Sequence, residues 1–212
     1  MSATAWSVAH GASAVSRSKG TVLRSTCGRT FSLSSDRWWR EPPDEEARLL
    51  RLALSPVLDL GCGPGRHTVA LSRLGLVALG VDSSAAAVAA ARAHGAAVTH
   101  RSVFDRLPSE GRWGTALLLD GNVGIGGDPL RLFRRVRELL RPGGRALVEV
   151  EGPGVASERL SVRAELDGSE TEWFPWARVG VDGVRDIAVP TGLCPVAVWS
   201  DGGRWFARLD AR

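Results

Sequence analysis

This chain of 212 residues has three cysteines, one lysine, no tyrosine and no long apolar run. The cysteines are Cys27, Cys62 and Cys194, and their odd number and wide spacing exclude a disulfide framework and a cysteine-rich metal site. Such sparse use of cysteine is typical of a reducing compartment, so we expect a cytoplasmic protein. No apolar run approaches the roughly 20 residues that a membrane-spanning helix needs, so we expect no membrane partner.

Acidic residues are missing from positions 1–35, which carry Arg17, Lys19, Arg24 and Arg29. Taking these four from the 27 basic residues leaves 23, which equals the 23 acidic residues. The net charge of +4 therefore comes from the N-terminal segment, and the rest of the chain gives no strong signal of nucleic-acid binding. One predicted helix is rich in arginine, although a solvated helix face explains it well. Its basic residues are Arg131, Arg134, Arg135, Arg137 and Arg141.

The length of the chain suits one α/β domain with a full hydrophobic core. Residues 1–19 are small and polar, so they bury too little apolar surface to fold, and we expect a disordered tail. Residues 20–212 are expected to form a single domain. Its parts are an N-terminal hairpin and cap at 21–43, a ligand-binding core at 44–151, and a C-terminal part at 152–212.

The stretch from Val57 to His67 has the pattern of a buried strand, a glycine-rich turn and the start of a helix. The apolar run at 57–60 indicates a strand that is buried on both faces. Glycines at 61, 63 and 65 permit positive φ in a tight turn and let a ligand approach the backbone. Because the helix that follows begins with unpaired N–H groups, the stretch predicts a cradle for a nucleotide-like ligand.

The spacing of the glycines distinguishes between ligands. A dinucleotide fingerprint, G-x-G-x-x-G, requires its third glycine at position 66, which is Arg66. The observed order is D-x-G-x-G-x-G, beginning at Asp59, and it resembles motif I of class I S-adenosylmethionine-dependent methyltransferases. A plain strand-to-helix turn is the alternative for this stretch alone.

A second predicted strand, at 76–81, ends in Asp82 and strengthens the resemblance. In doubly wound sheets, an acid at this point accepts hydrogen bonds from the ribose hydroxyls of the ligand. Capping of the next helix, together with Ser83 and Ser84, is the alternative role for Asp82, and both roles are compatible. The resemblance covers residues 44–151 well and the remainder loosely.

The resemblance implies that the cofactor is S-adenosyl-L-methionine. In the family, an acid shortly after strand three receives the adenine amino group, and a neighbouring apolar side chain packs on the ring. Asp105 and Phe104 match that pattern, and Asp120 ends the fourth predicted strand, where such sheets bind their ligands. The predicted cofactor-binding residues are Asp59, Gly61, Cys62, Gly63, Gly65, Asp82, Ser83, Phe104, Asp105 and Asp120.

Substrate-binding residues are predicted on both sides of this core. In the family, the segment before motif I often covers the cofactor and substrate, so Trp38 and Trp39 are candidates, with packing on the domain surface as the alternative. Asn122 is a third candidate, in a loop at 121–127 that we expect to be long and flexible.

Catalytic residues are harder to identify, and the candidates for a general base are Asp120 and His67. A structural role along the helix that follows the glycine turn is the alternative for His67. Asp120 and Asn122 are too few ligands for a divalent cation, so we expect no metal.

The resemblance also implies the fold class: α/β, with a doubly wound, Rossmann-like seven-stranded sheet of the class I methyltransferase type. The expected strand order is 3-2-1-4-5-7-6 with an antiparallel last strand. A short N-terminal extension carries a hairpin at 21–33, and an inserted β-hairpin has strands at 159–166 and 171–175. Further expected elements are helices at 44–54, 128–141 and 181–189 and strands at 97–101, 115–120 and 145–149.

Two absences narrow the methyl acceptor. The chain has no tyrosine, and therefore no Asn-Pro-Pro-Tyr after strand four, which counts against methylation of amides or of adenine amino groups. A single lysine, Lys19, excludes the Lys-Asp-Lys-Glu tetrad of ribose methylation. A small-molecule acceptor remains, methylated by in-line displacement with catalysis mainly through positioning.

Two other functions stay open. A methyltransferase acting on protein or RNA would use the arginine-rich helix or the basic N-terminal segment. A non-catalytic module that only binds S-adenosylmethionine would account for the wide loop at 121–127 and for the lack of an evident base.

Overall fold

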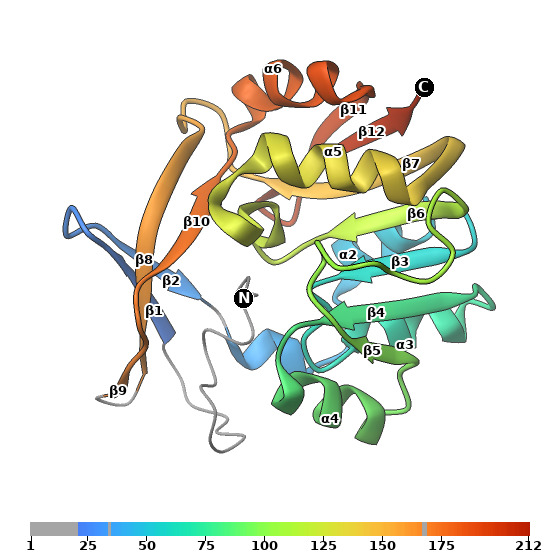
Figure 1. The fold of residues 1–212 in the computed structure, drawn as a ribbon, viewed down its shortest axis with the longest axis horizontal. Helices are drawn as coiled ribbons and strands as arrows, with labels where there is room; N and C mark the ends of the chain where they lie inside the picture. Colours follow the sequence, from blue (N-terminus) through green and yellow to red (C-terminus); the bar gives the residue numbers. More distant parts are fainter. Residues whose placement is uncertain (1–20, 34, 167–168) are drawn as a thin grey trace.

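The computed structural model describes residues 21–33, 35–166 and 169–212, which form two β-sheets and the helices around them (Figure 1). The tail predicted at 1–19 lies outside these described residues. Within them, no helix has the length and apolar character needed to cross a membrane.

The larger sheet has seven strands in the order β11-β12-β7-β6-β3-β4-β5. Numbered by their place in the chain, these strands run 3-2-1-4-5-7-6 from the opposite edge, so the predicted order is confirmed. β12 is antiparallel to both of its neighbours, whereas the pairs from β7 to β5 are parallel. The strands are β3 (Val57–Leu60), β4 (Ala78–Asp82), β5 (Val98–His100), β6 (Trp113–Leu118), β7 (Leu140–Val150), β11 (Leu193–Asp201) and β12 (Arg204–Ala211).

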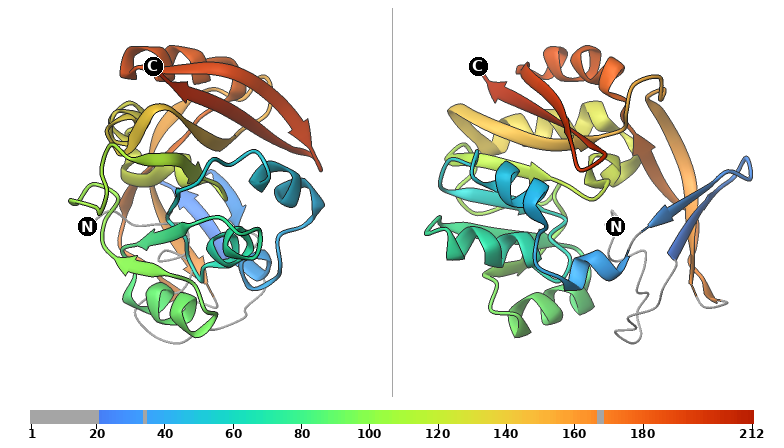
Figure 2. Two further views of the ribbon diagram at one scale, coloured as in Figure 1. Left: turned by 90° about the vertical axis from the view of Figure 1, so that its right-hand side faces the viewer. Right: turned by 180° about the vertical axis from the view of Figure 1, so that it is seen from behind.

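Helices cover both faces of this sheet (Figures 1 and 2). Buried residues of α2 and α3 share one hydrophobic cluster with the sheet, and those of α5 and α6 share the other, to which α4 contributes Ala87. Alternate residues of the central strands point into the two clusters, for example Leu117 into one and Leu118 into the other. The helices are α2 (Asp44–Leu50), α3 (Arg66–Arg73), α4 (Ala85–Ala93), α5 (Pro129–Leu139) and α6 (Val184–Ala188).

The first and last of the predicted helices differ in length from the expectation. α2 ends at Leu50, four residues before the predicted end at 54. The helix expected at 181–189 is α6 with short 3-10 turns on either side, η3 (Val181–Gly183) and η4 (Val189–Thr191).

The two hairpins outside the core join into a second, five-stranded sheet beside the carboxyl ends of the parallel strands (Figures 1 and 2). Its path is β10-β8-β1-β2, and the short strand β9 pairs with β8. β1 and β8 pair antiparallel although they are far apart in the chain, and Arg24 of β1 bonds to Glu165 of β8 across 141 residues. The strands are β1 (Thr21–Ser25), β2 (Thr30–Leu33), β8 (Glu158–Leu166), β9 (Ser169–Glu170) and β10 (Phe174–Arg178).

The segment at 121–127 is not the long flexible loop that the sequence suggested. Residues Asn122–Gly127 form a 3-10 turn, η2, that is largely buried under β10. A Cβ atom on Gly124 would lie 2.3 Å from the carbonyl oxygen of Ala177, and one on Gly127 would lie 2.7 Å from Pro175 Cβ. The expectation was wrong because these glycines serve close packing against the second sheet, which is a partner that the local sequence does not reveal.

Candidate functional site

The glycine-rich turn after β3 forms a tight cradle. Gly61, Gly63 and Gly65 have φ values of +77°, +53° and +84°, in the left-handed region that favours glycine. A Cβ atom on Gly61 would lie 2.7 Å from Asn122 Nδ2, and one on Gly65 would lie 2.8 Å from Ala96 Cβ. Gly61 and Gly65 therefore need both the backbone freedom and the small size of glycine.

Two buried acids hold this turn in place. Asp82, at the end of β4, accepts hydrogen bonds from the backbone N–H of Gly63 at 3.0 Å and of Ser84 at 2.8 Å. Asp59 accepts a hydrogen bond from Thr68 Oγ1 at 2.8 Å, and burial raises the pKa of its carboxyl. Asp59 thus fixes the start of α3, while Asp82 lies directly against the glycine turn.

Cys62 fills space behind the turn. Its side chain is buried, and a Cβ atom on Gly80 of β4 would lie 2.6 Å from its sulfur. Burial raises the pKa of its thiol well above the ordinary value, so the side chain is a neutral, apolar group. Its contribution to a bound ligand would come through its backbone.

The residues predicted to hold adenine line a wide cavity of about 600 Å³ at the ends of β4 and β5. Ser83, Phe104 and Asp105 are part of its wall, together with Arg131 of α5. The guanidinium carbon of Arg131 lies 4.2 Å from the centre of the Phe104 ring. One carboxylate oxygen of Asp105 accepts a hydrogen bond from Ser102 N at 2.8 Å.

A smaller cavity lies over the glycine turn and ends at Trp38, Arg66, His67, Asp120 and Asn122. The amide nitrogen of Asn122 donates to the carbonyls of Leu60 and Gly61, at 3.1 and 2.9 Å. Three buried polar atoms of residues that line this cavity have no hydrogen-bond partner among the described residues: Arg66 Nε, Arg66 Nη1 and Asn122 Oδ1. Arg66 Nη1 still forms an ion pair with Glu46 at 2.6 Å, which leaves one donor, Arg66 Nε, and one acceptor, Asn122 Oδ1.

Beneath this cavity lies a buried group of charged side chains that the sequence did not reveal. Glu46 of α2 is fully buried and accepts hydrogen bonds from Arg66 and Arg204. Arg66 also donates to both oxygens of Asp120, at 3.0 and 2.8 Å. The second arginine, Arg204 of β12, donates to Glu149 of β7 and to Asp120.

Sequence signals for these residues are weak. Arg66 stands out only as the residue that replaces a glycine of the dinucleotide fingerprint, and Glu149 as an acid at the end of an apolar strand. Glu46 is one of three consecutive acids at the start of a helix, where a solvated face is the usual arrangement.

His67 and Asp120, the two candidate bases, both belong to this charged group. His67 Nε2 lies 2.8 Å from Glu46 Oε2, and the ring is buried. Burial by itself would raise the pKa of the Asp120 carboxyl, but its interactions with Arg66, His67 and Arg37 outweigh burial, so the pKa is lowered. A carboxylate that is held ionised in this way is a weak proton acceptor.

Asp120 also has an unusual backbone conformation. Its φ is +56°, in the left-handed region that is uncommon for residues other than glycine, and its N–H donates to Glu149 Oε2 at 2.6 Å. Residues held in such conformations cluster at functional sites, where the surrounding contacts compensate for the strain.

The buried charged group predicts a loss of stability in acid. Burial alone would raise the pKa of Glu46, but the hydrogen bond from His67 and the charges of Arg66 and Arg204 lower it below its ordinary value of 4.5. A lowered folded-state pKa stabilises the fold above the unfolded-state pKa, and this contribution is lost as the pH falls through the folded-state value. We expect Glu46→Gln to be less stable than wild type at pH 7, with the difference shrinking below about pH 4.5.

The measurement is urea unfolding between pH 7 and pH 3. Glu41→Gln is the control, because Glu41 pairs with Arg73 at the surface, where both side chains are largely exposed and ion pairs contribute little. A stability difference for Glu46→Gln that stays constant with pH would contradict the expectation.

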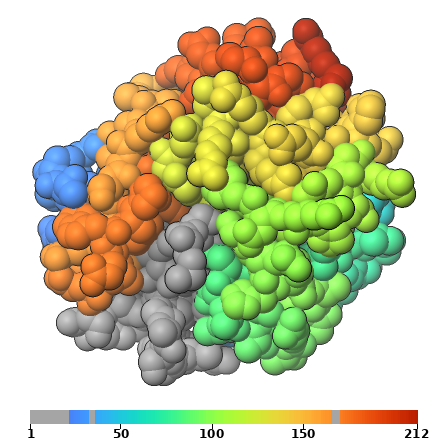
Figure 3. Space-filling view, in the orientation of Figure 1, coloured from blue at the N-terminus to red at the C-terminus, as the bar shows by residue number. Residues whose placement is uncertain are grey.

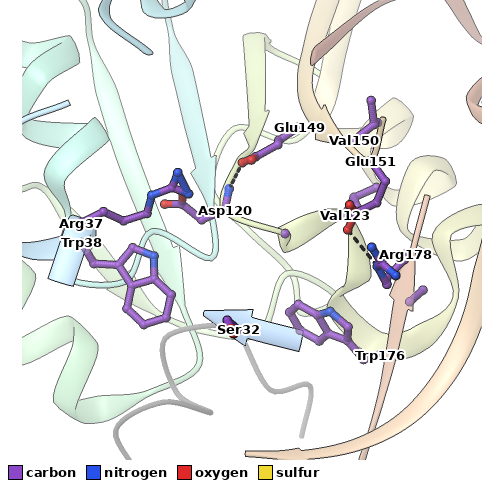
Figure 4. A pocket seen from close by; sticks show the side chains of 12 residues that line it. Ser32, Arg37, Trp38, Asp120, Val123, Glu149, Val150, Glu151, Trp176 and Arg178 are labelled. Atoms are coloured by element: carbon purple, nitrogen blue, oxygen red, sulfur yellow. Dashed lines mark hydrogen bonds and ion pairs between the residues drawn. The ribbon is translucent and has the colours of Figure 1, made fainter. Parts of the chain in front are cut away.

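A third cavity, of about 190 Å³, opens between the second sheet and the ends of β6 and β7 (Figure 4). Trp38 and Asp120 line both this cavity and the cavity over the glycine turn. Among the described residues these two are the only ones in both linings, so they lie between the two spaces. The other main wall residues are Arg37, Glu149, Glu151, Trp176 and Arg178.

The structure separates the three residues predicted to bind the substrate. Trp38 lines the third cavity, but Trp39 does not, and its ring instead meets the edge of His94 at a centroid distance of 5.5 Å. This is the packing role that the sequence left as the alternative. Asn122 lies over the glycine turn, beside the second cavity rather than the third.

Comparison with known proteins gives a family for the core and relatives at low identity. Residues 57–144 match a family model described as a methyltransferase domain. A ubiquinone biosynthesis O-methyltransferase of Cereibacter sphaeroides is 28% identical over 153 residues, which is 66% of this chain and 60% of that protein. The protein of the same name from Pseudomonas aeruginosa is 30% identical over 140 residues, 56% of this chain and 59% of that protein. The chain thus spans about 60% of the length of these curated relatives.

Solved structures share the whole fold. An S-adenosylmethionine-dependent methyltransferase from Bacteroides fragilis, in complex with S-adenosylhomocysteine, superposes with a TM-score of 0.74 at 22% identity, covering 92% of this chain and 89% of that one. A 1,6-didemethyltoxoflavin-N1-methyltransferase from Burkholderia thailandensis gives 0.61 at 18% identity, covering 84% and 81%. These structures confirm the predicted fold class, and the family model matches the core of the chain at residues 57–144.

Proposed function

We propose that this chain, a class I S-adenosylmethionine-dependent methyltransferase by its family model and its fold, methylates a small-molecule acceptor. The observation that carries the proposal is the position of Trp38 and Asp120 between two cavities. One cavity lies over the glycine turn, and the other has the size of a small organic molecule. A methyl group carried over the turn would meet an acceptor beside these two residues.

The residues around the glycine turn fit S-adenosylmethionine. The turn provides a cradle that side chains would fill, and Asp82 lies where a carboxylate would accept hydrogen bonds from ribose hydroxyls. The unpartnered donor Arg66 Nε and acceptor Asn122 Oδ1 suit the carboxylate and ammonium groups of an amino-acid end. Phe104 and Asp105 stay our candidates for the adenine end.

Catalysis in this proposal rests on positioning rather than on a strong base. S-adenosylmethionine supplies an activated methyl group, and holding two reactants in line contributes roughly 7–11 kcal/mol. Asp120 is held ionised by arginines, and His67 is bonded to Glu46. Asp120 therefore holds the wall of the site in place and is poorly suited to removing a proton of high pKa, whereas His67, oriented by Glu46, stays a candidate base.

The relatives support a small acceptor. The curated relatives are named for ubiquinone biosynthesis, and one structural neighbour is named for the N-methylation of a didemethyltoxoflavin. We also propose that residues 20–212 work as one domain, because Leu23 and Val162 of the second sheet belong to the same hydrophobic cluster as Leu58 of the main sheet. The sparse cysteines further support a cytoplasmic location.

Two measurements test the function. Calorimetric titration with S-adenosylmethionine, S-adenosylhomocysteine and NAD tests which cofactor the protein binds. Incubation of the protein with S-adenosylmethionine that carries a labelled methyl group, together with metabolite extracts, tests whether the methyl group is transferred. We expect binding of the first two ligands, no tight binding of NAD, and one labelled small product. Tight binding of NAD, or no binding of S-adenosylhomocysteine by the folded protein, would refute the proposal.

The cradle itself gives a mutational prediction. Gly61→Ala places a Cβ atom against Asn122, so we expect at least about a tenfold loss of S-adenosylhomocysteine affinity, which corresponds to about 1.4 kcal/mol. Gly75→Ala is the matched control, because Gly75 has a similar φ of +78° but no atom within 4 Å of the added Cβ. Calorimetry measures both affinities, and circular dichroism checks the fold. Equal losses in the two variants would show that backbone strain, not the cradle, causes the effect.

A further inference from the structure

The third cavity has features that restrict the acceptor to one chemical class. We propose that the acceptor is a compact, flat, uncharged molecule with a nucleophilic nitrogen, held between Trp38 and Trp176 with Glu151 accepting its N–H. This inference rests on the proposed function, and it adds the chemistry of the acceptor to it.

The size of the cavity limits the acceptor to one or two rings. Its volume is about 190 Å³, and an apolar cavity of about 150 Å³ holds a single benzene molecule. Pockets for drug-sized ligands have volumes of about 300–1,000 Å³. A long isoprenoid tail or a polymer would therefore extend beyond the walls that the described residues provide.

The walls favour a flat molecule. Trp38 of η1 (Ser35–Trp39) and Trp176 of β10 lie on different sides of the cavity, and both indole rings are buried (Figure 4). Trp176 is held in place by close packing, since a Cβ atom on Gly124 would lie 2.6 Å from its ring. Rigid aromatic walls bind flat rings well and lose little conformational entropy on doing so.

The acids of the cavity favour nitrogen over oxygen as the nucleophile. Glu149 accepts from Arg204 through both oxygens, at 2.8 and 2.5 Å, and from the N–H of Asp120. Asp120 is itself engaged by Arg66 and Arg204. A phenol has a pKa of about 10 and must lose its proton to become a good nucleophile, whereas a neutral nitrogen already presents a lone pair. The arrangement therefore suits an acceptor that needs no base before the transfer.

Of the acids that line the cavity among the described residues, Glu151 is the one whose carboxylate can accept a further hydrogen bond. Its Oε1 accepts a hydrogen bond from Arg178 Nε at 2.9 Å, and no described residue donates to its Oε2 (Figure 4). Its backbone is fixed by hydrogen bonds to Val179 and Val181. Glu151 thus lines the cavity from a fixed backbone position, with a side chain that is 40% exposed and one carboxylate oxygen to which no described residue donates.

The transfer step balances with these groups. The nitrogen lone pair forms the bond to the methyl carbon, the carbon–sulfur bond breaks, and its electron pair stays on sulfur. The positive charge moves from sulfur to nitrogen, and the N–H proton then leaves to Glu151 or to water. Indole faces attract such a cation, so Trp38 and Trp176 would stabilise the charge where it develops.

The test uses two probes of similar size, benzimidazole and 2-naphthol, with the full chain saturated by S-adenosylhomocysteine. We expect benzimidazole to bind at least about tenfold more tightly than 2-naphthol, as measured by saturation-transfer NMR titration. Trp176→Ala and Glu151→Gln should each weaken benzimidazole binding at least about fivefold. Incubation with S-adenosylmethionine should yield N-methylbenzimidazole, identified by mass spectrometry.

The control is Trp173→Ala, because Trp173 is exposed and lies outside the cavity wall on the same segment as Trp176. Its affinity for benzimidazole should equal that of wild type. Preference for 2-naphthol, no binding of benzimidazole, or an equal loss in Trp173→Ala overturns the inference. A protein that binds S-adenosylhomocysteine and fails these tests retains the proposed function, whereas one that does not bind it loses both.

Discussion

We expect Arg204→Met to lower the free energy of unfolding by about 3–5 kcal/mol, which is the usual cost of removing one partner from a buried ion pair. The Arg204 side chain is only 10% exposed and bonds to three carboxylates, those of Glu46, Asp120 and Glu149. Without it, these acids share the remaining charge of Arg66 in a poorly solvated space. The variant would also remove the ion pair that joins β12 to α2. The loss of stability should therefore appear in the global unfolding of the chain.

The matched control for this variant is Arg208→Met on the same strand. Arg208 pairs with Asp210, and both side chains are 29% exposed, so its removal should cost only about 0–1 kcal/mol. For a chain of this length, each 1 kcal/mol shifts the melting temperature by about 2–4 °C. Thermal and urea unfolding should therefore separate the two variants clearly. Similar losses for both would show that the buried charged group contributes no more than a surface pair.

The second large effect concerns the cofactor. Asp82→Ala should weaken S-adenosylmethionine binding by roughly ten- to a hundredfold, because hydrogen bonds to a charged acceptor contribute about 1.5–3 kcal/mol. Asp82 also accepts the N–H groups of Gly63 and Ser84, so its removal loosens the glycine turn as well. Both effects act in the same direction on affinity.

Two further variants separate these effects. Ser84→Ala removes the cap that accepts from Ala87 N at 3.3 Å, so it should cost stability and leave cofactor affinity unchanged. Asp82→Asn keeps an acceptor for the backbone but removes the charge, so its affinity should lie between wild type and Asp82→Ala. Calorimetric titration gives all three affinities. Wild-type affinity in Asp82→Ala would refute the ribose role.

Local sequence patterns predicted the core of the fold well. The run at 57–60 and the glycines after it gave a strand and a tight turn, and the structure has both, with positive φ at each glycine. Strand order followed from the family resemblance, and the sheet confirms it through β12, which returns antiparallel beside β7. The strand and the turn depend on short-range periodicity and on backbone sterics, which a few neighbouring residues determine, whereas the strand order came from the resemblance alone.

The features that shape the acceptor cavity depend on contacts between distant parts of the chain. The hairpins at 21–33 and 158–178 were each predictable, but their pairing through Leu23 and Ala164 was not, because strand pairing leaves no mark in the local pattern. Strand β10 of the same sheet, which pairs with β8, carries Trp176 against Gly124 and covers the expected flexible loop, which becomes a buried wall.

The buried charged side chains also depend on contacts between distant parts of the chain. Glu46, Arg66 and Arg204 lie on separate elements and would each be interpreted as solvated side chains, since burial of a charge is costly without a partner. Asp120 was predicted at the ligand-binding end of a strand, but its arginine partners were not. Only the tertiary structure supplies the partners, because the packing of α2, α3, β6 and β12 removes water from all four side chains at once. The sequence by itself therefore determined the glycine turn that we propose for the cofactor, and the fold decided the charge and shape of the space beside it.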